Sequence, residues 1–417
     1  MVQHISSEIA IIGAGVIGLA IAEALVSEGL EVVLIDLNPP GSGASYGNAG
    51  TIADYAVMPV GTPDVLKNLA SLLFNRNSPL SIHPGAWLSL APWLTRFARQ
   101  SLPANAAKNA RAIAALLGNA NALWHDLATR IGGLDLVEQK GCLYLYETEK
   151  ALRAAKADMA HRRSFGVEVD LITTRDLAHL EPNLPELPGA AFFPHASFLT
   201  DPGAMVQRLA QSALQYAGLL TARVDSLTRQ FDGIILDGAG LDGAGFRMHC
   251  KRVIIAAGAF ARPLAKMAGD EVPLDTERGY HLEWDMTTPR LTRPACPTSR
   301  GFYLCPMTGR LRAAGTVELG GLNAPPSQHH LNRLLHGART IFPDLPEPTA
   351  SWMGCRPSLP DSLPVLGPSK SGPEVIHAFG HGHIGLTLAP ITARIVTDLV
   401  QGRAPELDIT PYLPGRF

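Results

Sequence analysis

The chain has few of the residues that metal sites, disulfide scaffolds and membrane spans require. Only five cysteines occur in 417 residues, and no two of them are spaced as Cys-x-x-Cys. An odd number of scattered cysteines fits reduced thiols in a cytosolic chain and argues against zinc. Uninterrupted apolar runs of ~18 residues are also missing. We therefore expect a cytoplasmic protein without a metal ion and without a membrane span.

Neither sign of charge dominates the chain. It carries 35 Lys and Arg against 37 Asp and Glu, a formal net charge of −2. This balance gives no sign of a nucleic-acid partner. Residues 65–98 are rich in Leu and Trp with basic residues interspersed, which predicts a pair of packed surface helices. Peripheral contact with the inner face of the membrane is the alternative for this stretch.

The most specific feature is a glycine motif near the N-terminus. An apolar run leads into Gly13, Gly15 and Gly18, spaced as Gly-x-Gly-x-x-Gly, and then into an apolar helical pattern. Gly13 permits the strand-to-helix turn, Gly15 lets the backbone approach a pyrophosphate, and Gly18 lets the helix pack on the strands. Asp36, eighteen positions past Gly18, ends the next apolar run and can accept hydrogen bonds from a ribose. The motif predicts an ADP-containing dinucleotide.

Elements of nucleotide-binding type recur at the start, middle and end of the chain, with β-rich segments between them. The length allows two or three domains, and this order of elements indicates two that are interleaved. The helices predicted from apolar periodicity and capping residues span 104–130, 149–165, 202–216, 327–341 and 390–401. The strands predicted from apolar and β-branched runs lie within 136–146, 219–227, 233–236, 246–258 and 278–316.

Further segments carry a family resemblance. They are Gly-Ala-Ser-Tyr-Gly-Asn-Ala-Gly at 43–50, Ile-Ile-Ala-Ala-Gly-Ala-Phe at 254–260, Gly-Cys-Arg-Pro at 354–357 and Gly-His-Gly-His-Ile-Gly at 380–385. In this order the chain resembles the FAD-dependent D-amino-acid oxidase superfamily, in the branch with glycine oxidase and bacterial D-amino-acid dehydrogenase. The stretch 61–99 and the closing Leu-Pro-Gly-Arg-Phe resemble the dehydrogenase more.

The resemblance implies an α/β fold with two interleaved domains. A Rossmann-like FAD-binding domain would comprise residues 1–85, 186–270 and 354–417. An α+β substrate-binding domain, built on a mostly antiparallel sheet, would comprise residues 86–185 and 271–353.

The resemblance also implies FAD, held non-covalently because no cysteine follows Cys355. Asp36 would bind the adenosine ribose, Val224 would offer its backbone to the adenine, and the loop at 45–50 would wrap the pyrophosphate and the ring. Amides at the helix start after His383 can stabilise charge near flavin N1 and O2. The residues that we assign to FAD are Gly13, Gly15, Gly18, Asp36, Ser45, Asn48, Ala49, Gly50, Val224, Gly258, Ile384, Gly385, Leu386 and Thr387.

An amino-acid substrate needs a partner for its carboxylate, and the planar fork of arginine suits that group. Arg356 lies where the family has its carboxylate-binding arginine; its alternative is a surface ion pair. Tyr303 matches the family's tyrosine that hydrogen-bonds the same carboxylate; its alternative is ordinary packing.

Two histidines complete the candidate site. His383 stands where glycine oxidase has an arginine, and it could still hydrogen-bond substrate or flavin. His281 could face the pocket or be structural. Tyr280 and Tyr55 are further pocket candidates.

The function that the resemblance implies is an FAD-dependent dehydrogenase that oxidises the C–N bond of a D-amino acid, such as a D-proline or hydroxyproline type. Hydride would pass to flavin N5, and electrons would leave to a quinone or other acceptor. Catalysis would come mostly from orientation, because the sequence shows no Ser-His-Asp set and no defensible pair of carboxylates. The alternatives are an oxygen-using oxidase that makes peroxide and a non-catalytic flavin-binding subunit of a larger complex or oligomer.

Overall fold

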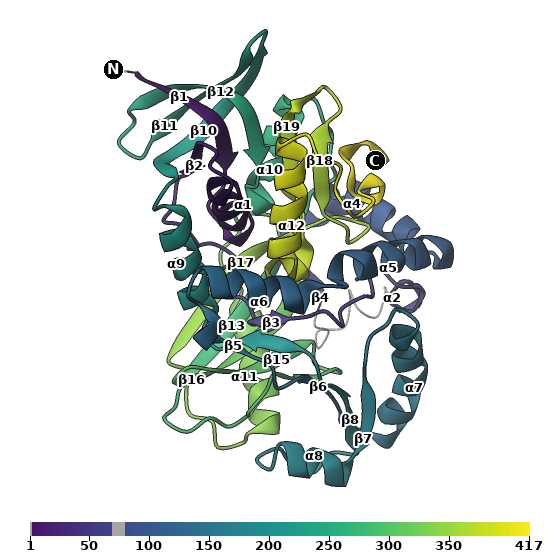
Figure 1. Ribbon diagram of the computed structural model, residues 1–417. Coiled ribbons are helices and arrows are strands. Elements are labelled where there is room, and N and C mark those ends of the chain that lie inside the picture. The colour runs from purple at the N-terminus through teal and green to yellow at the C-terminus, as the bar shows by residue number, and fades with distance from the viewer. Residues whose placement is uncertain (1, 69–79) are drawn as a thin grey trace.

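The computed structural model describes residues 2–68 and 80–417, and two large sheets organise them (Figure 1). The first sheet contains seven strands in the order β1-β2-β10-β11-β12-β19-β18, with β1 also beside β12. Their bounds are β1 Gln3–Ile12, β2 Val32–Asp36, β10 Gly218–Gln230, β11 Gly233–Gly240, β12 Gly245–Ile255, β18 Val365–Ser369 and β19 Gly372–Phe379.

β1 lies at the centre of this sheet. It pairs in parallel with both β2 and β12, so the turn that follows it opens at the carboxyl edge of three adjacent strands. Ile9 and Ile11 pack toward one side of the sheet, and Ala10 and Ile12 toward the other. A strand covered on both faces reads as a continuous apolar run, which is why the sequence predicts this one clearly.

Helices cover both faces of the first sheet. One face shares a single apolar core with five helices, and the other face is covered by α10 (Ala261–Met267). The five are α1 Val16–Ser27, α5 Pro103–Leu117, α6 Ala120–Arg130, α9 Pro202–Ala213 and α12 Gly385–Val400.

The last helix, α12, begins at Gly385, five residues before the predicted start at 390. Pro390 lies inside the helix and cannot donate the backbone hydrogen bond that Leu386 O would otherwise accept. The indole Nε1 of Trp124 donates to that carbonyl at 2.9 Å instead. A partner from α6 therefore allows the helix to continue through the proline.

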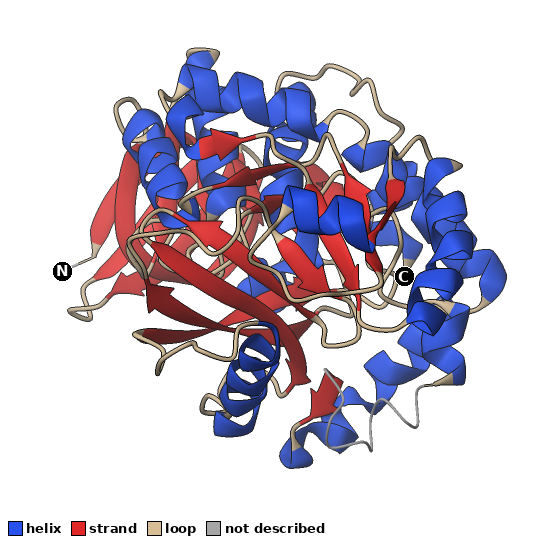
Figure 2. Ribbon diagram, turned by 90° about the horizontal axis from the view of Figure 1, so that it is seen from below, coloured by secondary structure: helices blue, strands red, loops and turns tan. Residues whose placement is uncertain are grey.

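The second sheet, mostly antiparallel as predicted, follows the order β17-β13-β16-β15-β14-β6-β8-β7, and β4 pairs with β16. In the view from below, the strands cross the molecule and helices surround them (Figure 2). One face packs on α11 (Gln328–Ile341). The strands are β4 Leu80–Ile82, β6 Cys142–Tyr146, β7 Asp170–Thr173, β8 Gly189–Phe193, β13 Asp275–Asp285, β14 Ala295–Pro297, β15 Phe302–Met307, β16 Arg310–Leu319 and β17 Ala350–Ser358.

Four segments fall on the other side of the predicted domain limits. β4, β8 and residues 354–358 of β17 belong to the second sheet, although 1–85, 186–270 and 354–417 were expected in the FAD-binding domain. Helices α5 and α6 pack into the core of the first sheet, although 86–185 was expected in the substrate-binding domain. The reason is that each segment packs its apolar face against the sheet that lies next to it in space. Nearness along the chain does not determine which sheet that is.

The remaining elements connect the two sheets. A small sheet joins β3 (Thr51–Ile52), β9 (Ser197–Leu199) and β5 (Val137–Glu138). Two further helices, α7 (Glu149–Arg163) and α8 (Thr174–Leu180), lie beside β8 at the end of the second sheet. These elements hold loops from the first sheet and loops from the second sheet close together.

The predicted pair of surface helices over 65–98 is described in part, because residues 69–79 lie outside the described residues. α2 (Pro63–Lys67) precedes them, and α4 (Trp87–Gln100) buries Leu90, Trp93 and Phe97 while leaving Leu88 93% exposed. One described segment, Gly382–Val400, has the length and composition of a membrane span, but 67% of it is buried. That burial is typical of a core helix.

Candidate active site

In the glycine turn after β1, an added Cβ would collide with backbone atoms at two positions and would meet only a side-chain hydroxyl at the third. Gly13 has φ +111°, and a Cβ there would lie 2.5 Å from Ala256 O at the end of β12. A Cβ at Gly18 would overlap Gly13 O. At Gly15 the nearest atom to a Cβ would be Ser45 Oγ, at 3.3 Å. The turn therefore fits tightly against the protein and leaves its middle glycine facing the loop that contains Ser45.

The start of α1 suits an anionic group. Gly15 is the N-cap, and as a glycine it has no side chain to accept from the amides that follow it. The first amides of a helix lack internal partners and attract anions. Val16 N donates to Ser45 Oγ at 2.9 Å, which draws the Ser45 loop to the helix start. These residues fit the pyrophosphate of a dinucleotide.

Asp36 lies at the carboxyl end of β2, next to the glycine turn. Its Oδ2 accepts from Ala14 N at 2.8 Å, and its Oδ1 accepts from Asn38 N at 2.9 Å. Each oxygen keeps a lone pair for a ribose hydroxyl. Thr221 of β10 is in register with Asp36, and Val224 follows where the β10–β11 register shifts. The structure thus places the residues predicted for ribose and adenine along one edge.

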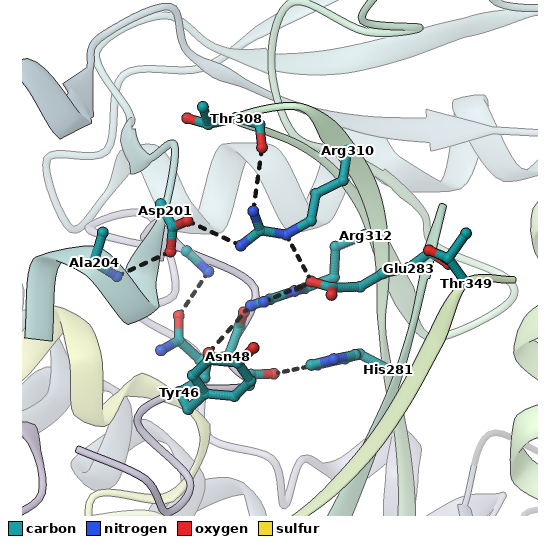
Figure 3. Close-up of polar contacts among 12 residues, drawn as sticks. Tyr46, Asn48, Asp201, Ala204, His281, Glu283, Thr308, Arg310, Arg312 and Thr349 are labelled. Carbon is teal, nitrogen blue, oxygen red and sulfur yellow. Dashed lines mark hydrogen bonds and ion pairs between the residues drawn. The ribbon is translucent and has the colours of Figure 1, made fainter. Parts of the chain in front are cut away.

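The loop at 45–50 is held by its own side chains and by the second sheet. Gly50 N donates to Asn48 Oδ1 at 2.7 Å, and Gly50 has φ +73°. From β16, Arg312 Nη1 donates to Asn48 O at 2.6 Å (Figure 3). Arg312 is itself fixed by an ion pair with Glu283, which also contacts Arg310. A charged network on the second sheet thus shapes a loop predicted to bind the cofactor.

His281 belongs to this supporting network. Its Nδ1 donates to Gly47 O at 3.0 Å, and its ring stacks on Trp352 with 5.2 Å between centroids. Burial, with Arg312 as a second cause, lowers the pKa of His281 to about 4, so the ring is neutral near pH 7. Of the two interpretations of the sequence, the described contacts favour the structural one: His281 braces the loop backbone.

Thr387 fixes the start of α12 to the segment that follows β3. Its Oγ1 accepts from Ala53 N at 3.0 Å, and its side chain is buried. Ile384 is the N-cap, and among the described residues no side chain caps the helix end through it. The amides of Gly385 and Leu386 therefore lie at the positive end of a long helix. This geometry fits a flavin ring with charge near N1 and O2.

The side chain of Arg356, on β17, occupies space that is free because its neighbour on β13 is a glycine. Its guanidinium covers Gly279 of β13, where an added Cβ would overlap it. Its Nη1 donates to Thr316 O at 3.0 Å, and Thr316 holds the left-handed conformation at φ +57°. Burial lowers the pKa of Arg356, and the charge of Glu277 opposes that effect. At neutral pH the group stays a cation with further N–H donors available.

A cavity borders Glu277, the cross-strand partner of Arg356. Five polar residues line it together with apolar ones, namely Glu277, Ser358, Ser362, His381 and His383. The side chain of His383 is accessible from the open cavity, yet the surrounding protein and then the charge of Arg356 lower its pKa to about 4. His383 is therefore neutral near pH 7. The structure thus brings His383 to this cavity, within range of the charge of Arg356.

Tyr303 lies in a cluster of tyrosines. Its hydroxyl donates to Tyr144 at 3.2 Å and accepts from Tyr55 at 3.4 Å, and burial raises the pKa of Tyr303. Tyr303 is in register with Ala314, and Ala314 with His281, so these side chains share one face of the sheet. Tyr280 points to the opposite face and stacks on His330. That places Tyr280 outside the candidate site.

Sequence reasoning missed several residues of this region. Glu277, Thr316 and Ser358 lie next to Arg356 on neighbouring strands or on its own strand, and Tyr144 contacts Tyr303 from β6. No motif marks them. A positive φ at a non-glycine residue or a cross-strand neighbour becomes visible only once the strands are paired.

Comparison with known proteins defines the class. The family model described as FAD dependent oxidoreductase matches residues 8–399, and the chain belongs to this family. FAD is accordingly its cofactor, as predicted, and the glycine turn, Asp36 and the α12 start fit that group. When bound, FAD supplies a redox centre that accepts two electrons as a hydride.

The relatives narrow the class. A D-amino-acid oxidase of Bradyrhizobium diazoefficiens is 33% identical over 424 residues, spanning 98% of each protein. D-amino acid dehydrogenase 2 of Ralstonia nicotianae is 27% identical over 429 residues, spanning 98% of this chain and 100% of that protein. A glycine oxidase from Geobacillus kaustophilus has a crystal structure that matches with a TM-score of 0.79, at 25% identity over 99% of each chain. The predicted family and fold class are confirmed.

Proposed function

We propose that the protein is a dehydrogenase that oxidises the C–N bond of a D-amino acid, with secondary cyclic substrates of the D-proline or hydroxyproline type as its preferred class. The observation that carries the proposal is the position of the Arg356 guanidinium over Gly279, across from Glu277 of the cavity that His383 lines. A fixed cation with open N–H donors suits a substrate carboxylate. The D-specific names of two full-length relatives support the choice of substrate hand.

Each residue has a simple task in this proposal. Arg356 binds the carboxylate. Tyr303 donates a hydrogen bond to the carboxylate once its hydroxyl no longer donates within the tyrosine cluster. His383, neutral near pH 7, offers a hydrogen bond without adding charge. Together these contacts fix the substrate so that its Cα–H faces the flavin, an orientation effect that can supply several kcal/mol of the barrier reduction.

For the electron acceptor we propose a quinone or a similar carrier. The support is the stretch 61–99, which resembles the dehydrogenase, and the exposed Leu88 of α4. We also propose that the protein is cytoplasmic and binds peripherally to the inner face of the membrane. An oxygen-using oxidase is the second candidate, and the 33% identity to an enzyme named an oxidase favours it.

The test of substrate class is anaerobic bleaching of the bound flavin across a panel of D- and L-amino acids. We expect D-proline and D-hydroxyprolines to bleach it fastest. Bleaching by L-amino acids alone would contradict the proposal. A yellow protein that no amino acid bleaches would instead support the non-catalytic subunit.

The test of the acceptor starts from the substrate-reduced protein. For a dehydrogenase we expect slow reoxidation on admitting air and rapid reoxidation by a soluble quinone. Rapid reoxidation in air with one peroxide per flavin would contradict the dehydrogenase and establish the oxidase.

A further inference from the structure

Glu277 stands directly across from Arg356. The two residues are register partners on the antiparallel strands β13 and β17, so their side chains lie on the same face of the sheet. Side chains in such a pair have Cβ atoms about 4.5–5.5 Å apart. Glu277 also lines the cavity, together with Ser358 and His383. A buried carboxyl group at the cavity therefore lies beside the guanidinium of the half-buried Arg356.

The carboxylate of Glu277 differs from other buried acids of this sheet. Glu283 forms ion pairs with Arg310 and Arg312, and Glu318 with Arg278. Glu277 is only 6% exposed, yet within the described part of the chain it forms no ion pair, and Arg356 forms none either. A buried charge without a partner is costly. The cost is recovered when a ligand brings the opposite charge.

The neighbouring groups also indicate that Glu277 is the anionic group of this cavity. Ser358 is buried at the same cavity, and its hydroxyl faces the carboxyl of Glu277, whose pKa it lowers. Burial raises the pKa of Glu277, and the charge of Arg356 lowers it. His381 and His383, the other titratable groups at this cavity, are neutral near pH 7. Burial lowers the pKa of His381 to about 3, and the surrounding protein together with the charge of Arg356 lowers that of His383 to about 4. Glu277 is thus the one candidate anion among the described residues that line this cavity.

We propose that Glu277 binds the amino group of the substrate, so that Glu277 and Arg356 together recognise an α-amino acid as a zwitterion. This rests on the proposed function. The ammonium and the carboxylate of an α-amino acid are attached to the same carbon, and a cross-strand pair of opposite charges matches that spacing. Ser358 Oγ accepts a second N–H of the same group.

The proposal makes Glu277 a determinant of specificity. An amino acid presents each of its charges to the opposite charge of the protein. A carboxylic acid of the same shape without nitrogen presents its carboxylate to Arg356 and leaves Glu277 unpaired. The wild-type protein should therefore bind the amino acid much more tightly than the acid, and the difference should come from one side chain.

The experiment compares D-proline with cyclopentanecarboxylate, which has the same ring without nitrogen. Glu277→Gln in the FAD-loaded protein should lower kcat/KM for D-proline by about 10- to 100-fold, mostly through KM. The same variant should bind cyclopentanecarboxylate as tightly as wild type or more tightly, measured by calorimetric titration. Glu168→Gln, an exposed glutamate that contacts His195, is the matched control and should change neither value.

Several results would overturn the proposal. Unchanged D-proline kinetics would do so, as would equal loss of both ligands, which indicates a structural role. A changed flavin spectrum without ligand and unchanged discrimination would show that Glu277 faces the flavin instead. If Glu277→Gln does not fold, Glu277→Asp replaces it and should weaken D-proline alone. Failure of the wild-type flavin to bleach with any amino acid would reject the proposed function, which is a separate outcome.

Discussion

The two binding regions of this protein use different parts of the chain, backbone groups in one and side chains in the other. The region around the first sheet uses backbone: three glycines, the amides at the start of α1 and one carboxylate, with the turn complete within six residues. The region on the second sheet uses long side chains from β13, β15 and β17, which are far apart in the chain. One region is sensitive to added atoms, and the other to lost charge.

This difference has an energetic basis. A Cβ at Gly18 would overlap Gly13 O, so even alanine forces the backbone to move. At Arg356 a smaller residue would fit without collision, but Glu277 would lose the cation that stands across from it on the neighbouring strand. The first site is therefore specified by shape, and the second by electrostatics.

The sharpest way to separate the two regions is Arg356→Ala. We expect kcat/KM for the amino acid to fall by on the order of 2–4 kcal/mol, because a charge-assisted contact to the carboxylate is lost. Bound FAD, measured by absorbance, should stay unchanged. Arg356→Lys keeps the charge without the fork and should lose less. Normal substrate binding by the alanine variant would show that the carboxylate is held elsewhere.

The converse change is Asp36→Ala. We expect FAD to bind more weakly by about 1.5–3 kcal/mol, because the ribose loses an anionic acceptor. KM for the substrate should stay the same in protein reconstituted with excess FAD. Asp36→Asn keeps an oxygen for Ala14 N and serves as the control for the local backbone. Unaltered flavin content in both variants would contradict the ribose role.

The smallest effect concerns His381, in the segment between the two regions. Burial lowers its pKa to about 3 from an ordinary value of 6.5, and its Nε2 lies 3.0 Å from Thr392 Oγ1. The unfolded chain therefore binds a proton that the folded protein excludes, and stability is lost as pH falls below about 6.5. Between pH 7.5 and 5 we expect a loss on the order of 1–2 kcal/mol in unfolding free energy from this group.

Urea unfolding of the wild type and of His381→Gln at both pH values measures this effect. The variant has no group to titrate there, so its stability should fall less over the same interval. An identical fall in both proteins would assign the acid sensitivity to other histidines, of which His330 and His281 are also buried.

The structure shows which parts of the fold follow from local sequence. The helix predicted over 327–341 is α11 (Gln328–Ile341), and the one over 149–165 is α7 (Glu149–Arg163). Both follow from capping residues and apolar spacing, which act within a few turns. The start of α12 was predicted wrongly, because the indole of Trp124, 262 residues earlier in the chain, satisfies the carbonyl freed by Pro390.

The candidate site divides in the same way. The family and FAD were predicted correctly from segments that each span a few residues. The roles of Arg356, Tyr303 and His383 stay predictions, now with a geometry that can be tested. His281 was a pocket candidate, but its ring contacts the Gly47 backbone, and that contact depends on how β13 meets the loop at 45–50.

The sequence by itself determined the glycine turn, Asp36 and the cofactor. These features act through consecutive backbone groups, so their geometry is local. Only the tertiary structure decided that Glu277 stands across from Arg356, that His281 braces the cofactor loop and that α5 and α6 join the first core. The physical reason is strand register and burial: they join residues that are distant along the chain, and no local pattern encodes which of them will meet.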